Sequence, residues 1–600
     1  MFATPTRVLI ASTLVSFASA QTIVRSIDGV AGDQLGRSVD YAGDYNNDGY
    51  PDLIVGCPGD SALLADQGSV RIVSGKYLAL GTGVKYLVTH YGFNSEPSFG
   101  WSVLNVGDLT GDGHPEFLVG QPSFDAFSSA LFQIYADEGQ VFLLDGAIGL
   151  NLIDTYAGSI VAANTGMQFG WSLANLGDWD HDGKTEVAVG APFYDGGLTQ
   201  RGRVYIVEAT ASGLVFESTL TGATDTEQFG YALSAANFGV YSGVSNVREL
   251  VVGCPGYEIL NTDQGRVQIY GRITSQTGAQ LITSYSGDAG SHFGHCVDAS
   301  VDITGDGYND LVVGEPYADT PNGTGSGRVY VFNGSSLIPN SWFQTFKLDG
   351  ASADDRFGTS ARGVQDVNGD GVRDIVVGAP NIDGILPSDN YGRVYAYSGD
   401  TGTLLESVGG FLHQRLGGVI GPALDFDGNG IAEWVACGPD SYNVATEAGV
   451  LAVISTFPAT PVVYCTGKTN SLGCVPALGY SGAPSASSGS PFTLTTSQLL
   501  NHRSGLSFYG FRPLAIPFQG GTMCVTSPSV RLPILDSGGS ATPANDCSGV
   551  LAYDFNARIQ SAVDPLLSVG QEVFLQTWAR DPVSASTTSL SNAIRFVIAP

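Results

Sequence analysis

The sequence predicts an all-β chain: a seven-bladed β-propeller followed by a small disulfide-containing domain that resembles a β-sandwich. Three observations lead to this fold class. Only 14% of the 600 residues are charged, 81 are Gly, and Val, Ile, Phe and Tyr recur in short runs, which is typical of short strands joined by tight turns. A Phe-Gly or Leu-Gly pair returns about every 64 residues. Each interval holds four strand-like runs, as a propeller blade does.

The first residues have the pattern of an export signal. Arg7 precedes the apolar run "VLIASTLVSFA", and the small-residue site "ASA" ends at Ala20, so we interpret residues 1–20 as a signal peptide. The run is too short for a transmembrane helix, and no later stretch approaches the length of about twenty apolar residues that one needs. We therefore expect a secreted or cell-surface protein without a transmembrane segment.

The charge balance excludes one class of partner and favours another. Lys and Arg number 26 against 57 Asp and Glu, which gives a formal net charge of −31. Such a chain would repel the phosphates of nucleic acid, so we expect no nucleic-acid partner. Clustered carboxylates instead fit cation binding.

Seven pairs mark the starts of the predicted blades. They are Leu35-Gly36, Phe99-Gly100, Phe169-Gly170, Phe229-Gly230, Phe293-Gly294, Phe357-Gly358 and Leu416-Gly417. In the second copy the four strands read "FGWSVLNVGD", "EFLVGQP", "GQVFLLDG" and "LIDTYAG". The runs "GRVYIV", "GRVQIY", "GRVYVF" and "GRVYAY" mark the third strand in four other copies.

The two ends of the repeat predict a closed ring. The seventh copy has a third strand, "GVLAVIST", but no fourth. At the other end of the chain, "TIVRSIDG" (22–29) matches "TFKLDG", the fourth strand before Phe357. We therefore expect residues 21–458 to form a propeller whose last blade is completed by the N-terminal strand, because closure removes exposed sheet edges.

Six copies carry a nine-residue acidic loop between their first and second strands. Oxygen-bearing side chains occupy positions 1, 3, 5 and 9, and Gly occupies position 6. The predicted metal ligands are Asp44, Asn46, Asp48 and Asp52; Asp108, Thr110, Asp112 and Glu116; Asp178, Asp180, Asp182 and Glu186; Asp302, Thr304, Asp306 and Asp310; Asp366, Asn368, Asp370 and Asp374; and Asp425, Asp427, Asn429 and Glu433.

This spacing favours Ca²⁺, which takes six to eight oxygen ligands. Gly at position 6 permits a sharp reversal that a Cβ would resist. Mg²⁺ fits less well, since it demands stricter octahedral geometry. The alternative is that Asp, Asn and Gly only build Asx turns. Turn chemistry requires no acid at position 9, so we interpret the closing acid as a metal ligand. The fourth copy, "NFGVYSGVSNVRE" (237–249), keeps only Glu249, so we expect six calcium sites and none in the fourth blade.

These features resemble the FG-GAP repeat of the integrin α-subunit β-propeller. The matching features are the Phe-Gly starts, the acidic loop, an apolar triplet and "GAP" (190–192, 378–380), with "GCP" (56–58, 253–255) and "GEP" (314–316) as variants. The resemblance covers roughly residues 22–457 and implies seven blades with calcium in the hairpins of one face. In integrin α-subunits, aromatic residues after Phe-Gly ring the upper centre and grip a basic side chain of the β-subunit. Here Arg37, Thr359 and Gly418 interrupt that ring, and no β-subunit is implied.

Two sets of aromatic residues are candidate ligand contacts. Trp101, Trp171 and Tyr231, with His295, follow the Phe-Gly pairs, and Tyr194, Tyr257 and Tyr317 lie in loops between second and third strands. Exposed aromatic rings suit protein hot spots and sugars. The alternative for the loop tyrosines is that they pack within their own loops.

From about residue 459 to 600 the texture changes to Ser, Pro and Gly. This segment resembles the tail domains of large bacterial surface proteins, and its runs "PFTLTTSQ", "EVFLQTWARD" and "NAIRFVIAP" indicate strands. Four cysteines in an exported region suggest two disulfides. Three connectivities are possible, and we favour the local pairs Cys465–Cys474 and Cys524–Cys547. The propeller residues Cys57, Cys254, Cys296 and Cys437 are interpreted as thiols.

No enzyme is predicted. "LDSGGSA" (535–541) has the letters of two protease signatures but neither of their contexts, and a Gly-rich turn is the ordinary interpretation. The favoured function is a non-catalytic, calcium-stabilised binding or adhesion module for an extracellular protein or a cell-surface ligand. A carbohydrate-binding, lectin-like propeller is the first alternative, and an exported polysaccharide-active enzyme is the second.

Overall fold

The computed structural model describes residues 22–598 apart from short gaps. The gaps are 65–66, 82, 94–96, 129–132, 148, 159–165, 240–247, 259–262, 273–278, 337–341, 369, 384–389, 412, 427–431, 442–446, 456–460, 487, 512, 527–528, 542–544, 562 and 568–570. The expected signal peptide lies outside the described residues. The chain divides into two compact units, one of residues 23–456 and one that includes residues 457–600.

The first unit contains seven four-stranded antiparallel sheets in its described residues. The innermost strands are β2 (Ser38–Gly43), β6 (Ser102–Gly107), β12 (Leu173–Gly177), β16 (Ala232–Ala236), β20 (Cys296–Asp298), β24 (Ser360–Val364) and β28 (Val419–Leu424). The second strands are β3 (Asp52–Cys57), β7 (Glu116–Gln121), β13 (Thr185–Ala191), β17 (Glu249–Cys254), β21 (Leu311–Glu315), β25 (Asp374–Ala379) and β29 (Glu433–Gly438).

The outer half of each sheet follows in the same order. The third strands are β4 (Ser69–Val73), β10 (Gln140–Leu144), β14 (Arg203–Thr210), β18 (Arg266–Arg272), β22 (Arg328–Phe332), β26 (Arg393–Tyr397) and β30 (Val450–Ser455). The fourth strands are β5 (Tyr86–Tyr91), β11 (Leu152–Ala157), β15 (Gly213–Thr221), β19 (Ala279–Ser286), β23 (Gln344–Asp349), β27 (Leu404–Gly409) and, for the last sheet, β1 (Thr22–Asp28).

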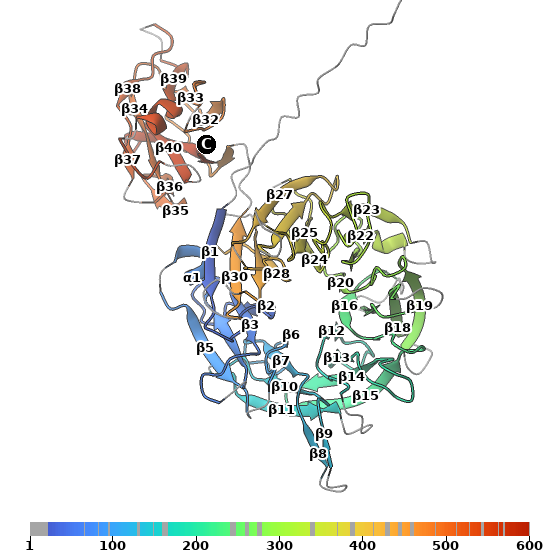
Figure 1. Ribbon diagram of the computed structural model, residues 1–600. Helices are drawn as coiled ribbons and strands as arrows, with labels where there is room; N and C mark the ends of the chain where they lie inside the picture. The colour runs from blue at the N-terminus through green and yellow to red at the C-terminus, as the bar shows by residue number, and fades with distance from the viewer. Residues whose placement is uncertain are drawn as a thin grey trace, which may run out of the picture. The chain divides into compact units, whose positions relative to one another are not determined.

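The sheets are arranged as the blades of a ring, with the first strand of each blade toward the centre (Figure 1). Neighbouring innermost strands contact one another around the whole circle, including β28 with β2. Six of the seven inter-blade junctions carry a parallel bridge from the Phe or Leu of a Phe-Gly or Leu-Gly pair to a Gly before a third strand, such as Phe169 to Gly139. The pair Leu35 and Gly449 makes the same bridge between the first and last blades. Together with β1 in the seventh sheet, this confirms the predicted ring closure.

The Gly residues of the two recurring motifs meet between blades. A Cβ at Gly56, in β3, would lie 1.9 Å from the carbonyl oxygen of Gly100 in the next blade. That carbonyl also accepts a hydrogen bond of 3.0 Å from the Ser38 hydroxyl. Close approach of two backbones therefore explains why Gly occupies both motifs, because a Cβ would force the blades apart.

A few elements interrupt the pure blade pattern. A six-residue helix, α1 (Gly75–Leu80), joins β4 to β5, and the Ser74 side chain caps its start by accepting from the Tyr77 amide at 3.3 Å. A short hairpin of β8 (Ala126–Ser128) and β9 (Gln133–Tyr135) extends the second blade, and a 3₁₀ turn spans Gly334–Ser336. None of the helices in the described residues has the length or the apolar run that crossing a membrane takes.

The second unit is a β-sandwich with one short helix. One sheet has the order β31 (Val462–Tyr464), β41 (Thr588–Val597), β40 (Glu572–Arg580), β34 (Ser504–Gly510) and β37 (Val530–Arg531), with β38 (Leu535–Asp536) also on β34. The other contains β32 (Ala477–Ser481), β33 (Thr493–Leu499) and β39 (Gly549–Asp554). The hairpin β35 (Pro513–Phe518) and β36 (Gly521–Val525) and the helix α2 (Phe555–Gln560) complete it. Residues of both sheets and of α2 share one core, which includes Leu494, Phe555 and Leu575.

The predicted disulfide pairing is wrong. Cys465 is bonded to Cys524, and Cys474 is bonded to Cys547. Both bonds join segments more than fifty residues apart, with separations of 59 and 73, because the sandwich brings distant strands together while the local pairs lie in different parts of the fold. The four propeller cysteines are free thiols, as expected.

A buried acid in the sixth blade gives a pH test of the fold. Glu406, in β27, is 6% exposed, its Oε1 has no hydrogen-bond partner among the described residues, and burial raises its pKa to about 8. Since the unfolded side chain ionises near pH 4.3, this residue costs the fold stability progressively as pH rises from there to about 8. In Glu406→Gln that slope disappears.

We therefore expect the melting temperature of Glu406→Gln, minus that of the parent chain, to increase between pH 5 and pH 8 and then level off. Melts in saturating calcium at each pH measure it. A difference that stays constant across this range would contradict the buried, unpaired carboxyl.

Candidate functional site

The acidic loops form hairpins between the first and second strands, held by their own side chains. At position 1, Asp44 accepts the amides of Asp48 at 2.9 Å and Gly49 at 2.8 Å. Asp302 repeats this with Asp306 at 3.2 Å and Gly307 at 2.8 Å. At position 5, Asp48 accepts the amide of position 7 at 3.2 Å. The Asx turns of the alternative interpretation are therefore present, but a carboxylate oxygen with one hydrogen bond keeps lone-pair capacity for a cation.

Position 6 behaves as the sequence predicts. Its Gly has φ between 87° and 91° in the five loops where it is described, at Gly49, Gly113, Gly183, Gly307 and Gly371. This is the left-handed region, in which a Cβ is strained.

The closing acid at position 9 has a role that the sequence analysis missed. In all seven blades it accepts the backbone amide of the apolar residue that follows the start of the loop. The pairs are Asp52 with Tyr45, Glu116 with Leu109, Glu186 with Trp179, Glu249 with Phe238, Asp310 with Ile303, Asp374 with Val367 and Glu433 with Phe426, at distances from 2.5 to 2.9 Å. These acids are at most 2% exposed.

Three of the closing acids also bind the chain just after the third strand of their own blade. The second oxygens of Asp52, Asp310 and Asp374 accept the amides of Gly75, Gly334 and Gly399, which directly follow the third strands or their first turn, at 2.7, 2.9 and 3.2 Å. Because Glu249 makes its bond in the copy without an acidic loop, the closing acid ties the hairpin to the blade whether or not a metal is bound. This hydrogen bond is a second reason for an acid at position 9, and the metal-ligand role of the acid stays a prediction.

The side chains of the acidic loops nevertheless fit a divalent cation. In the second loop Asp108, Asp112 and Glu116 offer oxygens within 4.8 Å of one another, and in the third loop Asp178, Asp180 and Glu186 do the same. Asp178 Oδ1 and Glu186 Oε1 are buried without a hydrogen-bond partner among the described residues. Buried oxygens of this kind normally have a partner, and coordination to a cation would provide one. Glu208 extends this group beside Asp182 and Glu186 and was not predicted.

Burial of these acids is unfavourable unless a positive charge compensates it. With no cation near, burial raises the pKa of Asp52 to about 6 and that of Glu186 and Asp374 to about 7. A nearby cation favours the charged form and lowers such values. In the third loop the Lys184 Nζ lies 3.1 Å from Asp182 and 2.6 Å from Glu208, so this lysine pairs with two acids beside Glu186.

Three loops are described only in part. Gly369 of the loop 366–374 lies outside the described residues. Asp427 and Asn429 of the last loop lie outside the described residues, although Glu433 lies within them. In the fourth blade, residues 240–247 lie outside them as well, so the absence of a metal there stays a prediction.

The residues that follow the Leu-Gly or Phe-Gly pair in the first five blades form a continuous row near the centre of the ring. We call it the axial row, and it consists of Arg37, Trp101, Trp171, Tyr231 and His295. The ring centroids of Trp101 and Trp171 are 4.7 Å apart, those of Trp171 and Tyr231 5.4 Å, and those of Tyr231 and His295 5.2 Å. Arg37 stacks on Trp101, with its Cζ 3.7 Å from the ring centroid. The chain's own cation therefore occupies one end of the row. Burial lowers the pKa of His295 to about 4, so this residue is neutral at physiological pH.

Below the axial row, the innermost strands line a cavity of about 460 Å³. Asp40, Asp298, Arg248 and Arg362 contribute charges to its wall. Burial raises the pKa of Asp40, an effect that Arg362 opposes. Asp298 accepts the amide of Gly363 at 2.9 Å, so these acids tie neighbouring blades together.

Two of the three loop tyrosines pack within their own blades, which is the alternative that the sequence analysis left open. Tyr194 and Tyr257 are 5% and 4% exposed, and Arg203 and Arg266 each lie with Cζ 3.7 Å from the ring centroid. Tyr317 is 41% exposed, although Arg356 stacks on it at 4.0 Å. The first two arginines begin the third-strand runs "GRVYIV" and "GRVQIY", so the recurring Arg after Gly was a signal for these stacks that the sequence analysis did not use.

The "LDSGGSA" segment is held as a turn. The Ser537 hydroxyl donates to the Leu500 carbonyl at 2.6 Å and accepts the Arg503 amide at 2.9 Å. His502 lies 3.6 Å from Asp536, and its Nε2 is 3.0 Å from the Ser540 carbonyl oxygen. No serine hydroxyl in this segment is recorded in a hydrogen bond to the imidazole, in the part of the chain that the structure describes, so the letters do not assemble into a triad.

Comparisons with known proteins agree with the repeat. The FG-GAP repeat model matches residues 99–144, 169–207, 297–332 and 357–397, and the FG-GAP-like repeat model matches residues 44–119. The chain is an FG-GAP repeat protein. Three of the matched segments start at Phe99, Phe169 and Phe357, and together the matches include five of the six acidic loops that the sequence analysis identified.

The relatives of this FG-GAP protein include integrin α-subunits, whose propeller it resembles. It is 33% identical to integrin alpha-V of Gallus gallus over 235 residues, 37% of this chain and 20% of that protein. It is 28% identical to integrin alpha-5 of Xenopus laevis over 235 residues, 36% of this chain and 20% of that protein.

A second kind of relative is an enzyme. Phosphatidylinositol-glycan-specific phospholipase D of Rattus norvegicus is 27% identical over 417 residues, 61% of this chain and 46% of that protein. The chain thus spans from a fifth to about half of the length of these relatives. The solved structure of Saccharomyces cerevisiae Sqt1 aligns with 78% of this chain and 94% of that chain at 10% identity and a TM-score of 0.38, which carries no functional argument.

The two roles of position 9 can be separated by mutation. Glu249→Ala removes a buried acceptor in the blade without an acidic loop, so we expect a loss of about 1–3 kcal/mol that is the same with calcium and with chelator. Asp374→Ala removes both the tie and a predicted ligand, so its loss is larger in calcium than in chelator. Paired melts of both variants and the parent measure this. Equal losses for Asp374→Ala in both buffers would contradict a metal-ligand role.

The stack of Arg37 on Trp101 gives a second prediction. Arg37→Met keeps an apolar side chain of similar length but removes the cation, and we expect a loss of about 0.5–2 kcal/mol together with a shift of the tryptophan emission. A melt and an emission spectrum check it. An unchanged spectrum would show that Arg37 does not cover Trp101 in solution.

Proposed function

We propose that this protein is an exported, calcium-stabilised propeller that binds an extracellular protein and has no catalytic role of its own. The observation that carries the proposal is the recurrence of the acidic loop, in phase with the Phe-Gly repeat, in a chain similar to integrin α-subunits. Calcium is assigned a structural role, because the loops are tied into the blades by buried carboxylates rather than opened toward a substrate.

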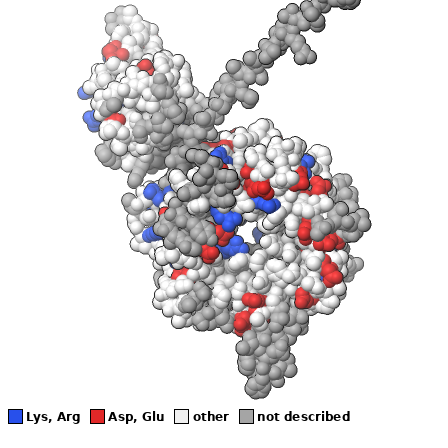
Figure 2. Space-filling view, viewed as in Figure 1, with Lys and Arg blue, Asp and Glu red and all other residues white. Residues whose placement is uncertain are grey.

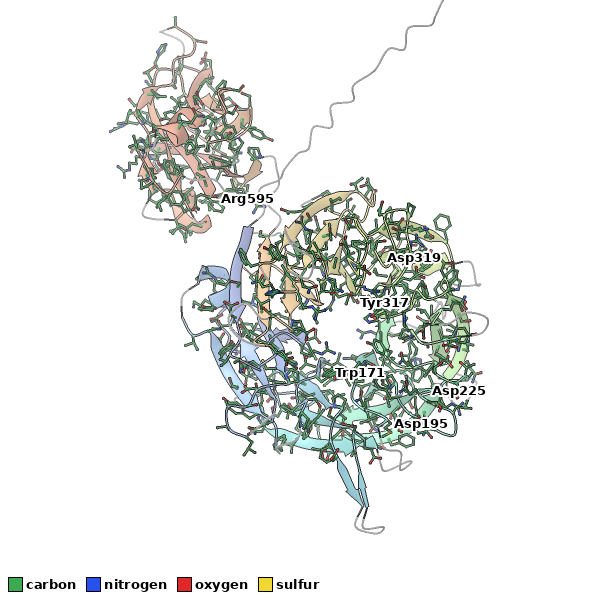
Figure 3. All side chains as sticks on the ribbon, in the orientation of Figure 1. Trp171, Asp195, Asp225, Tyr317, Asp319 and Arg595 are labelled. Atoms are coloured by element: carbon green, nitrogen blue, oxygen red, sulfur yellow. A yellow bond between two sulfur atoms is a disulfide. The ribbon has the colours of Figure 1, made fainter. Side chains whose placement is uncertain are left out.

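The face formed by the loops between second and third strands is the proposed binding surface. Each of these loops carries at least one acid, and Asp125, Asp195, Asp319 and Asp383 are exposed. Figure 3 shows Trp171 and Tyr317 beside the centre of the ring, with Asp195, Asp225 and Asp319 farther out. Figure 2 shows basic side chains beside the centre and acidic side chains spread over the outer part of the visible face. We call the exposed acids Asp125, Asp195, Asp319 and Asp383 the acidic rim, and we infer a protein partner that presents basic side chains to it.

Each rim acid is shaped by its own loop. Asp195 Oδ1 accepts the Gln200 amide at 2.9 Å, and Asp319 Oδ1 accepts the Gly325 amide at 2.9 Å. The other oxygen of each is left to a partner or to solvent. Asn keeps the Oδ1 acceptor but removes the charge, so Asp→Asn changes test the electrostatic contribution without opening the loop.

A carbohydrate-binding propeller is the second candidate. It is favoured by the half-buried tryptophans of the axial row and weakened by the burial of Tyr194 and Tyr257. Similarity to a phospholipase D leaves hydrolysis as a third possibility, which an assay against glycosylphosphatidylinositol-anchored protein tests directly.

The proposal predicts calcium-dependent capture of protein from extracellular-matrix and cell-wall extracts by the immobilised chain. The triple variant Asp195→Asn, Asp319→Asn, Asp383→Asn is expected to capture at least ten times less. Asp400→Asn, an exposed acid in the turn after β26, is the control and is expected to match the parent. Capture that survives protease treatment of the extract but not glycosidase treatment would favour the carbohydrate-binding candidate instead.

A further inference from the structure

The C-terminal sandwich contains a groove whose floor is one face of the sheet. Along β34, Leu506 and Phe508 point to the same side because alternate residues share a face. Across the strand, Leu506 is paired with Trp578 of β40, and Phe508 is paired with Arg531 of β37. Directly opposed residues of an antiparallel pair lie on the same face, so the four side chains form one surface.

The walls of this groove come from the hairpin β35–β36 and the segment around Ile534. Phe518 and Met523 line it from the hairpin, and Ile534 is 69% exposed beside it. The enclosed space is about 480 Å³, within the range of roughly 300–1,000 Å³ typical of small-ligand sites. The core that holds Tyr509 and Leu575 lies on the other face of the same sheet. On the groove side, Leu506, Phe508, Met523 and Trp578 pack with Val525 and Phe574, so the floor of the groove is a small packed cluster that the cavity borders.

The hairpin wall is fixed in place. Gln576, on β40, accepts the Cys524 amide at 3.1 Å and donates to the Thr522 carbonyl at 3.0 Å. The disulfide from Cys524 to Cys465 and a 2.6 Å hydrogen bond from the Tyr464 hydroxyl to the Cys524 carbonyl hold the same strand. The groove is therefore formed before any ligand arrives.

The charges of the groove are of one sign. Arg531 and Arg580 line it, both exposed, and neither is paired with an acid among the described residues, whereas propeller arginines such as Arg71 are bonded to two aspartates. No carboxylate lines the groove among the residues that the structure describes. In a chain with 57 acids and 26 bases, two unpaired guanidinium groups over an aromatic floor are unusual, and a guanidinium fork matches a carboxylate in two parallel hydrogen bonds.

We propose that this groove binds an acidic oligosaccharide, with carboxylates of different uronic acid units held by Arg531 and by Arg580 and a sugar face stacked on Trp578. The hydroxyls of Ser504 and Ser529 and the amide of Gln519 stand among the aromatic residues, and this mixture suits a sugar ring, which has one apolar face and a rim of hydroxyls. The site belongs to the C-terminal domain and is independent of the protein partner proposed for the propeller.

The test uses the full chain and two matched probes, an oligogalacturonate and the neutral galacto-oligosaccharide of the same length. Titration calorimetry and quenching of tryptophan emission are expected to show binding of the acidic probe and at least tenfold weaker binding of the neutral one. Arg531→Gln and Arg580→Gln each weaken the acidic probe at least tenfold, and Trp578→Leu removes the quenching. Arg558→Gln, which makes the same change of charge on α2 outside the groove, leaves binding unchanged.

Chelation of calcium separates this inference from the proposed function, because the groove contains none of the acidic loops and its binding is expected to persist in chelator. Three results would overturn the inference: equal binding of the acidic and neutral probes, binding that is unaffected by either arginine change, or tighter binding of a glutamate-rich peptide than of the oligogalacturonate. The last would indicate an acidic peptide as the ligand of the groove.

Discussion

Each blade of this propeller depends on one buried hydrogen bond between a carboxylate at the start of its second strand and a backbone amide at the start of the preceding hairpin. The bond recurs in all seven blades of the described structure, from Asp52 and Tyr45 in the first to Glu433 and Phe426 in the last. A carboxylate acceptor makes a stronger bond than a neutral one, but its charge is costly to bury. The rest of the loop chemistry follows from this combination.

We propose that the acidic loops offset that cost. In the proposed calcium-bound state, a cation among positions 1, 3, 5 and 9 compensates the charge of the closing acid, while the amide of position 2 donates to one of its oxygens. In the fourth blade no acidic loop is present, and burial raises the pKa of Glu249 to about 7, so this acid is partly protonated near neutral pH. The two arrangements are alternative ways to keep a carboxylate in a hydrophobic hairpin base. On the proposed function, calcium stabilises a hydrogen bond that the fold already contains.

The fold was predictable from the sequence wherever a local pattern repeats in phase. The period of the Phe-Gly pairs predicted the number and bounds of the blades. The missing fourth strand of the seventh copy predicted that β1 completes the last blade. Gly at position 6 followed from the turn it must make. The sequence predicted an acid at position 9 as a metal ligand but did not predict its hydrogen bond to the backbone. The bond from the Val367 amide to Asp374 involves a main-chain group, which a pattern of side chains does not show. The sequence did not decide between a packed and an exposed Tyr194, because the arginine that covers this ring lies nine residues downstream, at the start of the next strand.

The C-terminal domain could be predicted only as a class. It has no repeat, and its order depends on strands such as β34 and β40 that are about seventy residues apart. Cys465 and Cys524 meet because β31 and β36 both pack near β40 and β41, which no spacing reveals. The groove with Trp578, Arg531 and Arg580 depends on the same long-range pairing, so composition and motifs gave no sign of it.

The most direct test of the account is a thermal melt of the intact chain in saturating calcium, after full chelation, and after calcium is restored. For each site, a ligand at ten times its dissociation constant adds about 1.4 kcal/mol to the free energy of unfolding. The account predicts a melting temperature that falls by several degrees on chelation and recovers when calcium returns, with magnesium at the same concentration restoring less. A melting temperature that is the same in all three conditions would contradict it.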